Sequence, residues 1–398
     1  MKLKVAIIGS GAAGATAALY FHQSGHQVTI FEREEKPTPV GAGIMLQPTG
    51  LKILKNLGLE KKALELGCII KGLHGENHRN KTILDFKFQN KKKLTGLGIS
   101  RGALFFILFD ELIRQEIDIK LGAEIIAIDN KKNILTDKNN NLYKGYNLII
   151  VANGARSALR KDNTNISLNK TQKYGALWAK LPYDNSVFHH KIYQKYEGSH
   201  TMIGFMPMGR LDEQSPETVN FFWSIKMRDV EKWETEDLEE WKDKVKRFCP
   251  EYAEVIDVIK SKDQVTIAPY TDVVLSPSYQ NNIVFIGDSA HPMSPQLAQG
   301  ASFAMLDAKI LFENISQHPT NIDLALKNYH QQRSKQVYFY QKLSRWVTPI
   351  FQSDTCNTSL RDKLFPIFSK LPFIKTLITT IVLGYRESYF KNIDKKYY

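Results

Sequence analysis

Cysteine is scarce in this sequence, with three residues among 398. Cys68, Cys249 and Cys356 are far apart along the chain and odd in number. They cannot form the dense disulfide framework of a small secreted domain, and their spacing is not that of a zinc site. The pattern therefore predicts a protein of a reducing compartment, the cytoplasm, that holds no metal ion.

Long apolar runs are also missing. No run approaches the ~20 residues that a membrane-spanning helix needs. The first residues, MKLKVAIIGSG, lead directly into a strand-and-glycine pattern rather than into a secretory leader. The longest candidate, LITTIVLG near the C-terminus, follows a segment interrupted by Lys370, Pro372 and Lys375. It predicts a helix that docks on the protein or lies on a membrane surface without crossing it.

A basic helix or an aromatic-rich basic strand is missing too, although the formal net charge is +13. The lysines are scattered through turn-like segments such as NKKK, DNKKN and KNIDKKYY. This favours a solvated basic surface, which could also attract anionic cofactors or substrates, over a nucleic-acid interface.

The most informative pattern that is present lies at the N-terminus, in KVAIIGSGAAGATAALYFHQSGHQVTIFERE. An apolar strand is followed by Gly9, Gly11 and Gly14 in the order G-x-G-x-x-G, then by a small-residue helix and a second strand that Glu32 closes. The glycines permit a tight turn, close approach to a pyrophosphate and helix-to-strand packing. Glu32 suits the hydroxyls of an adenosine ribose. Both FAD and NAD fit this fingerprint.

A second pattern lies near the other end, in VFIGDSAHPMSPQLAQG. An apolar strand stops at Gly287 and Asp288, and the next turn is stiffened by Pro292 and Pro295. A carboxylate at a strand end, followed by a rigid turn and a helix, predicts that a ligand docks here.

Read together, four segments resemble the single-component FAD-dependent aromatic monooxygenases, the family of para-hydroxybenzoate hydroxylase and the tetracycline-degrading monooxygenases. They are GSGAAG with FERE, SRGALFFILFDEL, LIIVANGARSALR and GDSAHPMSPQLAQGAS. The resemblance implies that Asp288 bonds a ribityl hydroxyl of FAD and that Pro295 lies on the reactive side of the flavin ring. It also implies that the helix opening at Gly300 directs its N–H groups at the pyrimidine end, where a helix N-terminus stabilises negative charge.

From this resemblance we predict that Pro295, Gly300 and Ala301 lie at the reacting part of the flavin. The predicted FAD-binding residues are Gly9, Gly11, Ala12, Ala13, Gly14, Glu32, Arg33, Gly43, Arg101, Gly154, Asp288, Pro295, Gly300, Ala301 and Ser302. Arg101 suits a phosphate or a flavin carbonyl. A surface charge is the alternative for Arg101 and for Arg33.

The third segment departs from the family pattern, which has Asp before Gly at this point. Here Asn153 precedes Gly154, while Ser157 and Arg160 are retained. Asn keeps the size and the hydrogen-bonding groups of Asp but lacks its charge. The departure leaves FAD binding intact and brings the efficiency of reduction or the choice of reductant into question.

The predicted fold is α/β: a Rossmann-like FAD-binding domain of the para-hydroxybenzoate hydroxylase type, an inserted, mostly antiparallel substrate-binding sheet, and C-terminal helices. The FAD-binding domain is assigned to residues 1–75, 97–170 and 275–345. The substrate domain takes residues 76–96 and 171–274. Residues 346–398 form the helical C-terminal segment, with Pro349 breaking the preceding helix.

Large side chains of the inserted sheet could line a substrate pocket or form ordinary core; the candidates are Trp178, Phe205, Met206, Phe222 and Trp223. Three histidines, His189, His190 and His200, do not have the spacing of a metal-ligand set. His291, close to Asp288, is interpreted as structural.

The resemblance implies a monooxygenase in which NADH or NADPH reduces FAD and O₂ adds to form a flavin C4a-hydroperoxide, which hydroxylates a small aromatic or conjugated substrate. There is no second G-x-G-x-x-G unit for the nicotinamide donor, which fits transient binding. The alternatives are a halogenase, epoxidase or alkene reductase on the same scaffold, or a flavin-binding protein without turnover. The sequence makes no prediction of the oligomeric state.

Overall fold

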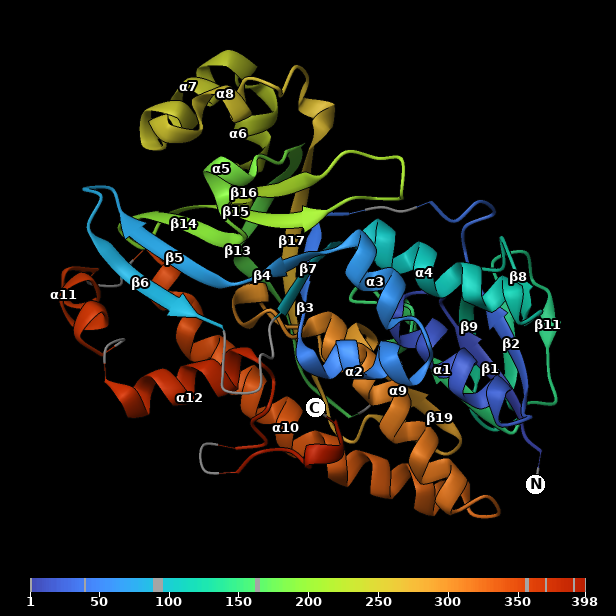
Figure 1. Ribbon diagram of the computed structural model, residues 1–398. Coiled ribbons are helices and arrows are strands. Elements are labelled where there is room, and N and C mark those ends of the chain that lie inside the picture. The colour runs from blue at the N-terminus through green and yellow to red at the C-terminus, as the bar shows by residue number, and fades with distance from the viewer. Residues whose placement is uncertain are drawn as a thin grey trace.

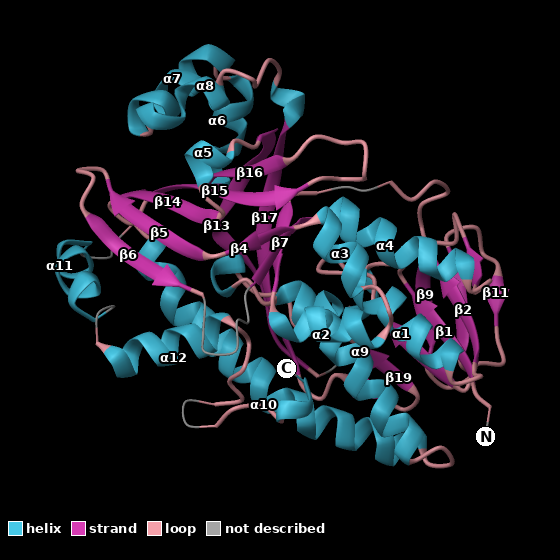
Figure 2. Cartoon of the chain, in the orientation of Figure 1, coloured by secondary structure: helices cyan, strands magenta, loops and turns pink. Residues whose placement is uncertain are grey.

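The computed structural model describes residues 2–38, 41–88, 96–161, 165–354, 358–368, 371–388 and 391–397. These residues form two neighbouring lobes, one around a six-stranded sheet that contains both N-terminal strands and one around a seven-stranded sheet (Figure 1). Helices cover both sheets, and one long helix runs along the lower edge of the molecule in this view (Figure 2).

The six-stranded sheet has the strand order β18-β19-β12-β1-β2-β8, and every neighbouring pair is parallel except β18 with β19. Its central strands are continuous apolar runs because a parallel sheet is covered on both faces. The strands are β1 (Lys4–Ile8), β2 (Gln27–Phe31), β8 (Asp118–Lys120), β12 (Leu148–Val151), β18 (Tyr279–Gln280) and β19 (Ile283–Phe285).

Alternate residues of these strands point to opposite faces of the sheet. Val5 and Ile7 pack with helices, whereas Ala6 and Ile8 pack against a small antiparallel sheet. The helices of the first face are α1 (Ala12–Gln23), α2 (Pro48–Asn56), α3 (Glu60–Leu66), α4 (Arg101–Arg114) and α9 (Gly300–Gln317). The small sheet consists of β9 (Ile125–Asp129), β10 (Ile134–Asp137) and β11 (Leu142–Tyr143).

The seven-stranded sheet has the order β17-β13-β16-β15-β14-β5-β6, and only β5 with β14 is a parallel pair. Its strands are β5 (Gly72–Asn77), β6 (Thr82–Lys87), β13 (Ile166–Pro182), β14 (Lys191–Glu197), β15 (Thr201–Gly209), β16 (Thr218–Lys226) and β17 (Val265–Leu275). One face carries α5 (Asn185–Phe188), α6 (Val230–Thr235), α7 (Leu238–Phe248) and α8 (Ala253–Ile256).

A third small sheet joins the lobes. It contains β3 (Gly43–Leu46), β4 (Cys68–Ile70) and β7 (Gly96–Ser100) in the order β3-β7-β4. A Cβ on Gly98 would lie 1.9 Å from the carbonyl oxygen of Pro207, so β7 and β15 approach too closely for any side chain at this point. This contact holds the seven-stranded sheet against the lobe of the six-stranded sheet.

The C-terminal part is helical and consists of α10 (Ile322–Phe351), α11 (Thr358–Phe368) and α12 (Pro372–Val382). The expectation that Pro349 breaks the helix is wrong, because α10 continues through it to Phe351. A proline so close to a C-terminus removes one helical hydrogen bond and leaves the preceding turns intact. Short 3₁₀ turns occur at Ala158–Arg160, Met227–Asp229, Pro250–Tyr252, Lys262–Gln264, Gly287–Ser289, Pro295–Leu297 and Lys395–Tyr397.

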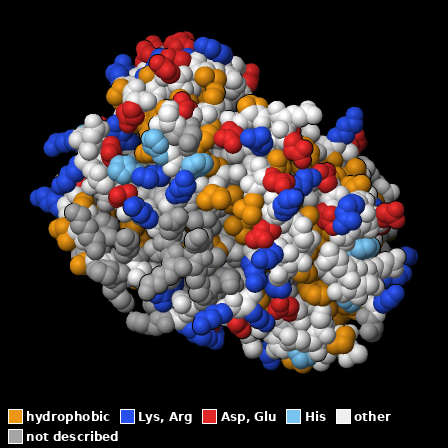
Figure 3. Space-filling view, in the orientation of Figure 1, with side chains coloured by type: hydrophobic (Ala, Val, Ile, Leu, Met, Phe, Trp, Pro, Cys, Tyr) orange, Lys and Arg blue, Asp and Glu red, His pale blue; other side chains and the backbone are white. Residues whose placement is uncertain are grey.

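On the face seen in Figure 3, Lys and Arg side chains are interspersed with Asp and Glu rather than gathered into one basic tract. Within the described part of the chain, no helix is both long and apolar enough to span a bilayer. The same residues contain no group of three or more His, Cys, Asp or Glu side chains placed to bind a metal ion.

Candidate functional site

The glycine-rich loop between β1 and α1 is shaped by the two outer glycines. Gly9 has φ +101° and lies against the backbone of Ala152, 2.7 Å from where its Cβ would be. A Cβ on Gly14 would lie 1.9 Å from the carbonyl oxygen of Gly9. Gly11 differs, because no atom lies within 4 Å of the position of its missing Cβ. Open space therefore adjoins the N-terminus of α1, which no side chain caps.

Glu32 follows β2 and turns towards this loop. Its carboxylate accepts hydrogen bonds from the backbone N–H of Ser10 at 3.0 Å and from the Ser10 hydroxyl at 2.5 Å. The carboxylate is thus held beside the glycines. Arg33 instead pairs with Glu34 at 2.9 Å and its side chain is 66% exposed, as expected for a surface charge.

Gly287 and Asp288, from the C-terminal half of the chain, lie next to helix α1 and the start of helix α9. Gly287 has φ +59°, and a Cβ there would lie 3.1 Å from the Cβ atoms of both Ala13 in α1 and Ala304 in α9. Gly287 therefore lies between the two helices, where a side chain would have little room. The Asp288 carboxylate lies 3.8 Å from the position of a Cβ on Gly300. The strand-end carboxylate and the start of α9 are therefore adjacent.

The N-terminus of α9 is open to a ligand. Gln299 is its N-cap residue but makes no side-chain capping bond, so the first N–H groups of the helix lack the usual partner. Gly300 is exposed, as is Pro295 in the preceding 3₁₀ turn, and Ala301 is half-buried. Ser302 is fully buried, and its hydroxyl accepts a bond from the Gln47 N–H at 2.9 Å. The Ser302 side chain therefore connects the start of α9 to the backbone of Gln47, which directly precedes α2.

The segment after β12 is tied to Asp288 by Arg160. This arginine is 5% exposed and donates to the carbonyl oxygens of Ser289 at 2.9 Å and Asp288 at 3.4 Å, and also to that of Ala155. Burial lowers its pKa from the ordinary arginine value. Gly154 has φ +81° and open space beside it. Sequence reasoning noted that Arg160 is retained but missed this bridge.

Two predicted FAD contacts lie on the side facing the seven-stranded sheet. Arg101 begins α4, is exposed, and has its Cδ 3.0 Å from where a Cβ on Gly41 would be. Gly43 donates its N–H to Asn220 Oδ1 at 2.9 Å, and a Cβ there would meet Met208 Sδ at 2.3 Å. Gly43 thus provides close packing between β3 and the seven-stranded sheet.

Several buried polar atoms around this place have no hydrogen-bond partner in the described structure. Sequence reasoning missed most of their residues, because polar side chains inside apolar segments are recognisable only once their neighbours are known. They are Gln47 Oε1, Thr49 Oγ1, Asn153 Oδ1, Ser157 Oγ, Asn220 Nδ2, Ser294 Oγ and Gln299 Oε1. A buried polar atom without a hydrogen bond destabilises the folded protein, and a bound ligand or water molecule normally supplies the missing bond.

Asp307 of α9 stabilises the turn at Gly287 and Asp288. Its carboxylate is fully buried and accepts the Gly287 N–H at 2.8 Å and the Arg333 Nε–H at 2.6 Å, while His291 Nε2 lies 2.6 Å away. Burial alone would raise the pKa of Asp307, but His291, Arg333 and the hydrogen bonds together lower it to about 2. His291 thus bonds an interior carboxylate.

The large side chains of the seven-stranded sheet are divided between its two faces. Trp178, Met206 and Phe222 lie in the cluster that also contains Ala298 of the α9 loop and residues of α10–α12. Phe205 and Trp223 belong to the opposite face, under α6–α8. Only the first three can face the predicted flavin.

The arrangement fits FAD. Open space adjoins Gly11 at an uncapped helix N-terminus, and a second uncapped N-terminus lies beside Asp288. Among the buried polar atoms without a hydrogen-bond partner in the described residues, Asn153 Oδ1 belongs to a residue beside Gly9 and Gln299 Oε1 to the N-cap residue of α9. A parallel βαβ unit with this loop, completed by a strand-end carboxylate from the distant part of the chain, defines a dinucleotide-binding protein.

The family model described as FAD binding domain matches residues 2–339, and the chain belongs to that family. It is 23% identical to 6-hydroxynicotinate 3-monooxygenase of Pseudomonas fluorescens, over 86% of this chain and 90% of the relative. It is 24% identical to the FAD-dependent urate hydroxylase of Mycolicibacterium vanbaalenii, over 84% of this chain and 85% of that one.

Solved structures share the fold. The tetrameric form of 2-methyl-3-hydroxypyridine-5-carboxylic acid oxygenase matches with a TM-score of 0.78 and 20% identity, over 95% of this chain and 96% of that one. A Klebsiella pneumoniae HpxO variant complexed with FAD gives a TM-score of 0.78 and 19% identity, over 96% and 99%. The predicted family resemblance, the α/β fold class and FAD as the cofactor are confirmed.

Proposed function

We propose that the chain is an FAD-dependent monooxygenase that uses NADH or NADPH and O₂ to hydroxylate a small aromatic or conjugated substrate. The observation that carries this proposal is the meeting of the glycine loop, Asp288 and the N-terminus of α9 at one open place. The relatives named above are a 6-hydroxynicotinate 3-monooxygenase and an FAD-dependent urate hydroxylase, which supports the enzyme class and a small, ring-shaped substrate.

FAD, when bound, would be held by residues from both the N-terminal and the C-terminal part of the family region. Its pyrophosphate binds the N–H groups of Ala12, Ala13 and Gly14 beside the open space at Gly11. Glu32 accepts the adenosine ribose hydroxyls, which requires it to share or release the bonds from Ser10. Asp288 accepts a ribityl hydroxyl.

The flavin supplies the oxygen-transfer chemistry when it is bound, and the chain controls the conditions around it. The uncapped N–H groups of Gly300, Ala301 and Ser302 and the positive end of α9 stabilise negative charge at the pyrimidine edge. Gly300 presents no side chain that would block the ring. Pro295 shapes the turn on the reacting side.

The substrate is proposed to bind between that turn and the sheet face carrying Trp178, Met206 and Phe222. Aromatic and thioether side chains bind a planar ring and exclude water from the reaction. The Nε1–H of Trp178 is buried close to the Tyr270 hydroxyl, and we propose that a polar substituent of the substrate bonds to this pair of groups.

The domain division also remains our proposal. Strands β5 and β13 begin at Gly72 and Ile166, ahead of the expected starts at residues 76 and 171, and β17 ends at Leu275. Helix α10 crosses the expected boundary at residue 346. A cytoplasmic location is supported by Cys68 and Cys249, which are buried free thiols.

A flavin-binding protein without turnover is the second candidate, and Asn153 is the feature that favours it. Its Oδ1 is buried and unpaired next to Gly154, where the resembled family carries Asp. In the Asn153→Asp variant, faster flavin reduction by NADH or NADPH would identify this position as the limit on turnover. An unchanged, working enzyme would remove the basis of this candidate.

The assay is oxidation of NADH and NADPH by the purified, FAD-loaded protein across a panel of phenols and hydroxypyridines. We expect one compound to accelerate oxidation and to yield a product heavier by one oxygen atom, with ¹⁸O₂ as the source. NAD(P)H oxidation with no product from any compound, or no oxidation at all, would contradict the proposal.

A further inference from the structure

The end of α12 and the residues that follow it lie beyond the part of the chain that the family model matches. They are nevertheless deeply buried: Leu383 is inaccessible and Tyr385 is 4% exposed. We name residues 381–386 the clamp segment. Two separate sets of hydrogen bonds attach it to the elements that are proposed to hold FAD.

The first attachment is to the start of α9. Gln299 Nε2 donates to the carbonyl oxygen of Val382 at 2.7 Å and to that of Ile381 at 3.4 Å, and the Tyr340 hydroxyl donates to Ile381 at 2.8 Å. The last carbonyls of a helix have no partner within it, so α12 depends on these donors. Gln299 directly precedes Gly300, and it is 2% exposed.

The second attachment reaches the Asp288 turn through a buried relay. Gln336 Nε2 donates to the carbonyl oxygens of Gly384 at 3.0 Å and Arg386 at 3.2 Å, while its Oε1 accepts a bond from Arg333 Nη1. Arg333 in turn binds Asp307, which holds the Gly287 N–H. The relay therefore runs from the clamp segment to the residue before Asp288.

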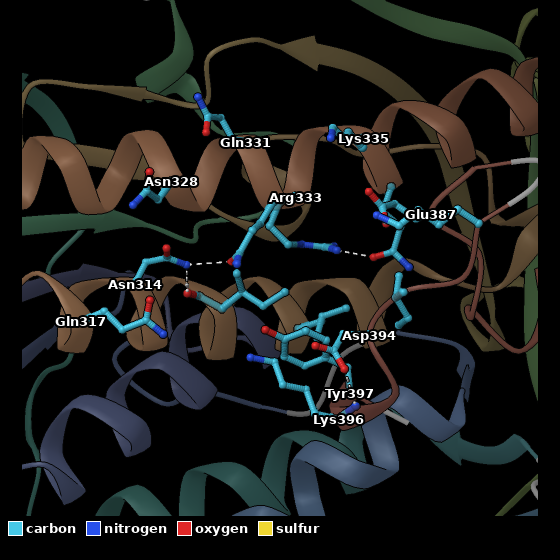
Figure 4. Close-up of a pocket in the computed structure, with 16 residues that line it drawn as sticks. Asn314, Gln317, Asn328, Gln331, Arg333, Lys335, Glu387, Asp394, Lys396 and Tyr397 are labelled. Carbon is cyan, nitrogen blue, oxygen red and sulfur yellow. Dashed lines mark hydrogen bonds and ion pairs between the residues drawn. The ribbon is translucent and has the colours of Figure 1, made fainter.

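The relay lies where three parts of the chain meet. Arg333 lines a cavity of about 490 Å³ whose walls also include residues of α9 and, from the C-terminal part, Glu387 and Ile393; Figure 4 shows Arg333 extending from α10 towards α9. Asp307 is inaccessible, Gln336 is 1% exposed and Arg333 is 4% exposed. Hydrogen bonds in such a low-dielectric interior are strong, and an unpaired member is costly.

We infer that the clamp segment positions both flavin-contacting elements, the Gly287–Asp288 turn and the N-terminus of α9, and so determines the affinity for FAD. The inference rests on the proposed placement of FAD and adds residues to it that touch no cofactor. Because coupling between two sites is reciprocal, FAD must also stabilise the docked clamp segment by the same factor.

The first test replaces Gln336 with leucine, which is similar in size but can neither donate to the clamp segment nor accept from Arg333. We expect the FAD dissociation constant to rise roughly tenfold or more, with loss of several buried hydrogen bonds. Gln332→Leu is the matched control on the same helix, because it removes a bond between α9 and α10, from Asn314 at 2.9 Å, but no bond to the clamp segment.

The second test uses glycines of equal backbone strain. A Cβ on Gly384 (φ +76°) would lie 2.6 Å from Gln299 Oε1, whereas a Cβ on Gly58 (φ +77°) would meet nothing within 4 Å. Both alanine variants bear the same conformational penalty. We expect weaker FAD binding and an altered visible circular dichroism of the bound flavin in Gly384→Ala only.

The third test needs no variant. FAD should slow tryptic cleavage after Arg386 and Lys391 of the wild-type chain by roughly tenfold, and this protection should vanish in Gln336→Leu. A wild-type chain that binds no FAD would overturn the proposed function itself. A wild-type chain that binds FAD without protecting these bonds, with Gln336→Leu and Gly384→Ala binding FAD as tightly as their controls, would overturn the clamp alone.

Discussion

The two lobes contribute to the site in different ways. The parallel-sheet lobe offers backbone: glycines without side chains, two uncapped helix N-termini, and carboxylates at strand ends. The seven-stranded lobe offers large side chains, Trp178, Met206 and Phe222, on one face. Ligand binding by backbone groups requires glycine at particular positions of a short segment. Ligand binding by side chains depends instead on which face of the sheet each side chain points to. The first lobe is thus suited to a fixed cofactor and the second to a variable substrate.

The largest effect is expected within the glycine loop, in the parallel-sheet lobe. Gly14→Ala places a Cβ 1.9 Å from the Gly9 carbonyl oxygen, so we expect about 3 kcal/mol of lost folding stability. Gly11→Ala has open space, so its unfolding free energy should stay close to that of the wild type while FAD binding weakens. Chemical denaturation without FAD, followed by FAD titration, measures both. Equal loss of stability in the two variants would refute the distinction.

The next largest effect is the pH dependence of folding stability that Asp307, the carboxylate bound to the Gly287 N–H, is expected to cause. The pKa of Asp307 is lowered from 3.8 to about 2 in the folded chain. Its charged form therefore contributes roughly 2.5 kcal/mol, present above pH 3.8 and lost as the pH falls through 2. Unfolding free energy measured from pH 5 to pH 2 should fall less steeply in Asp307→Asn than in the wild type.

An exposed carboxylate supplies the control for that pH profile. Asp110→Asn removes an exposed acid that pairs only with the exposed Lys62, at 3.3 Å, among the described residues. Its profile should follow that of the wild type. If Asp307→Asn and the wild type lost stability in parallel, the buried carboxylate would not have the low pKa that its partners imply.

The strand-end carboxylate comes next. Asp288→Ala removes the proposed acceptor for a ribityl hydroxyl, and a hydrogen bond to a charged group contributes about 2 kcal/mol, or roughly 30-fold in the FAD dissociation constant. The apo protein should remain folded, because the structure gives this carboxylate no hydrogen-bond partner among the described residues. Fluorescence titration with FAD provides the measurement, and unchanged affinity would exclude Asp288 from the site.

The smallest predicted effect is on substrate binding by the lobe of the seven-stranded sheet. Trp178→Phe keeps an aromatic ring but removes the buried Nε1–H beside Tyr270, so KM for the substrate should rise about fivefold, as for one neutral hydrogen bond. Trp223→Phe makes the same change on the opposite face of the sheet and should leave KM unaltered. Steady-state kinetics on both variants compare the two faces; equal effects would place the substrate elsewhere.

The backbone-based half of the site was accessible from the sequence. Gly9, Gly11 and Gly14 have spacing that geometry requires, and the Gly287–Asp288 pair ends an apolar run, so local pattern alone points to both. That they meet depends on Gly287 lying between α1 and α9, a contact across the whole chain. Only the family resemblance indicated it in advance.

The remainder required the fold. The sequence could not assign Phe205 and Trp223 to one face and Trp178 to the other, because register and strand order decide this. Gly43 turned out to pack against Met208 and Asn220, and Arg33 to pair with Glu34. The Gln336 relay joins three distant segments, and no spacing in the sequence reveals it.

The first and last thirds of the FAD-binding family region are proposed to close around a single FAD. Titration of the purified, deflavinated chain with FAD measures this binding. We expect saturation at one FAD per chain, quenched flavin fluorescence, and weaker binding in both Gly11→Ala and Asp288→Ala. A folded chain that stays colourless in excess FAD, or that binds FAD equally well when both positions are changed together, would contradict the account.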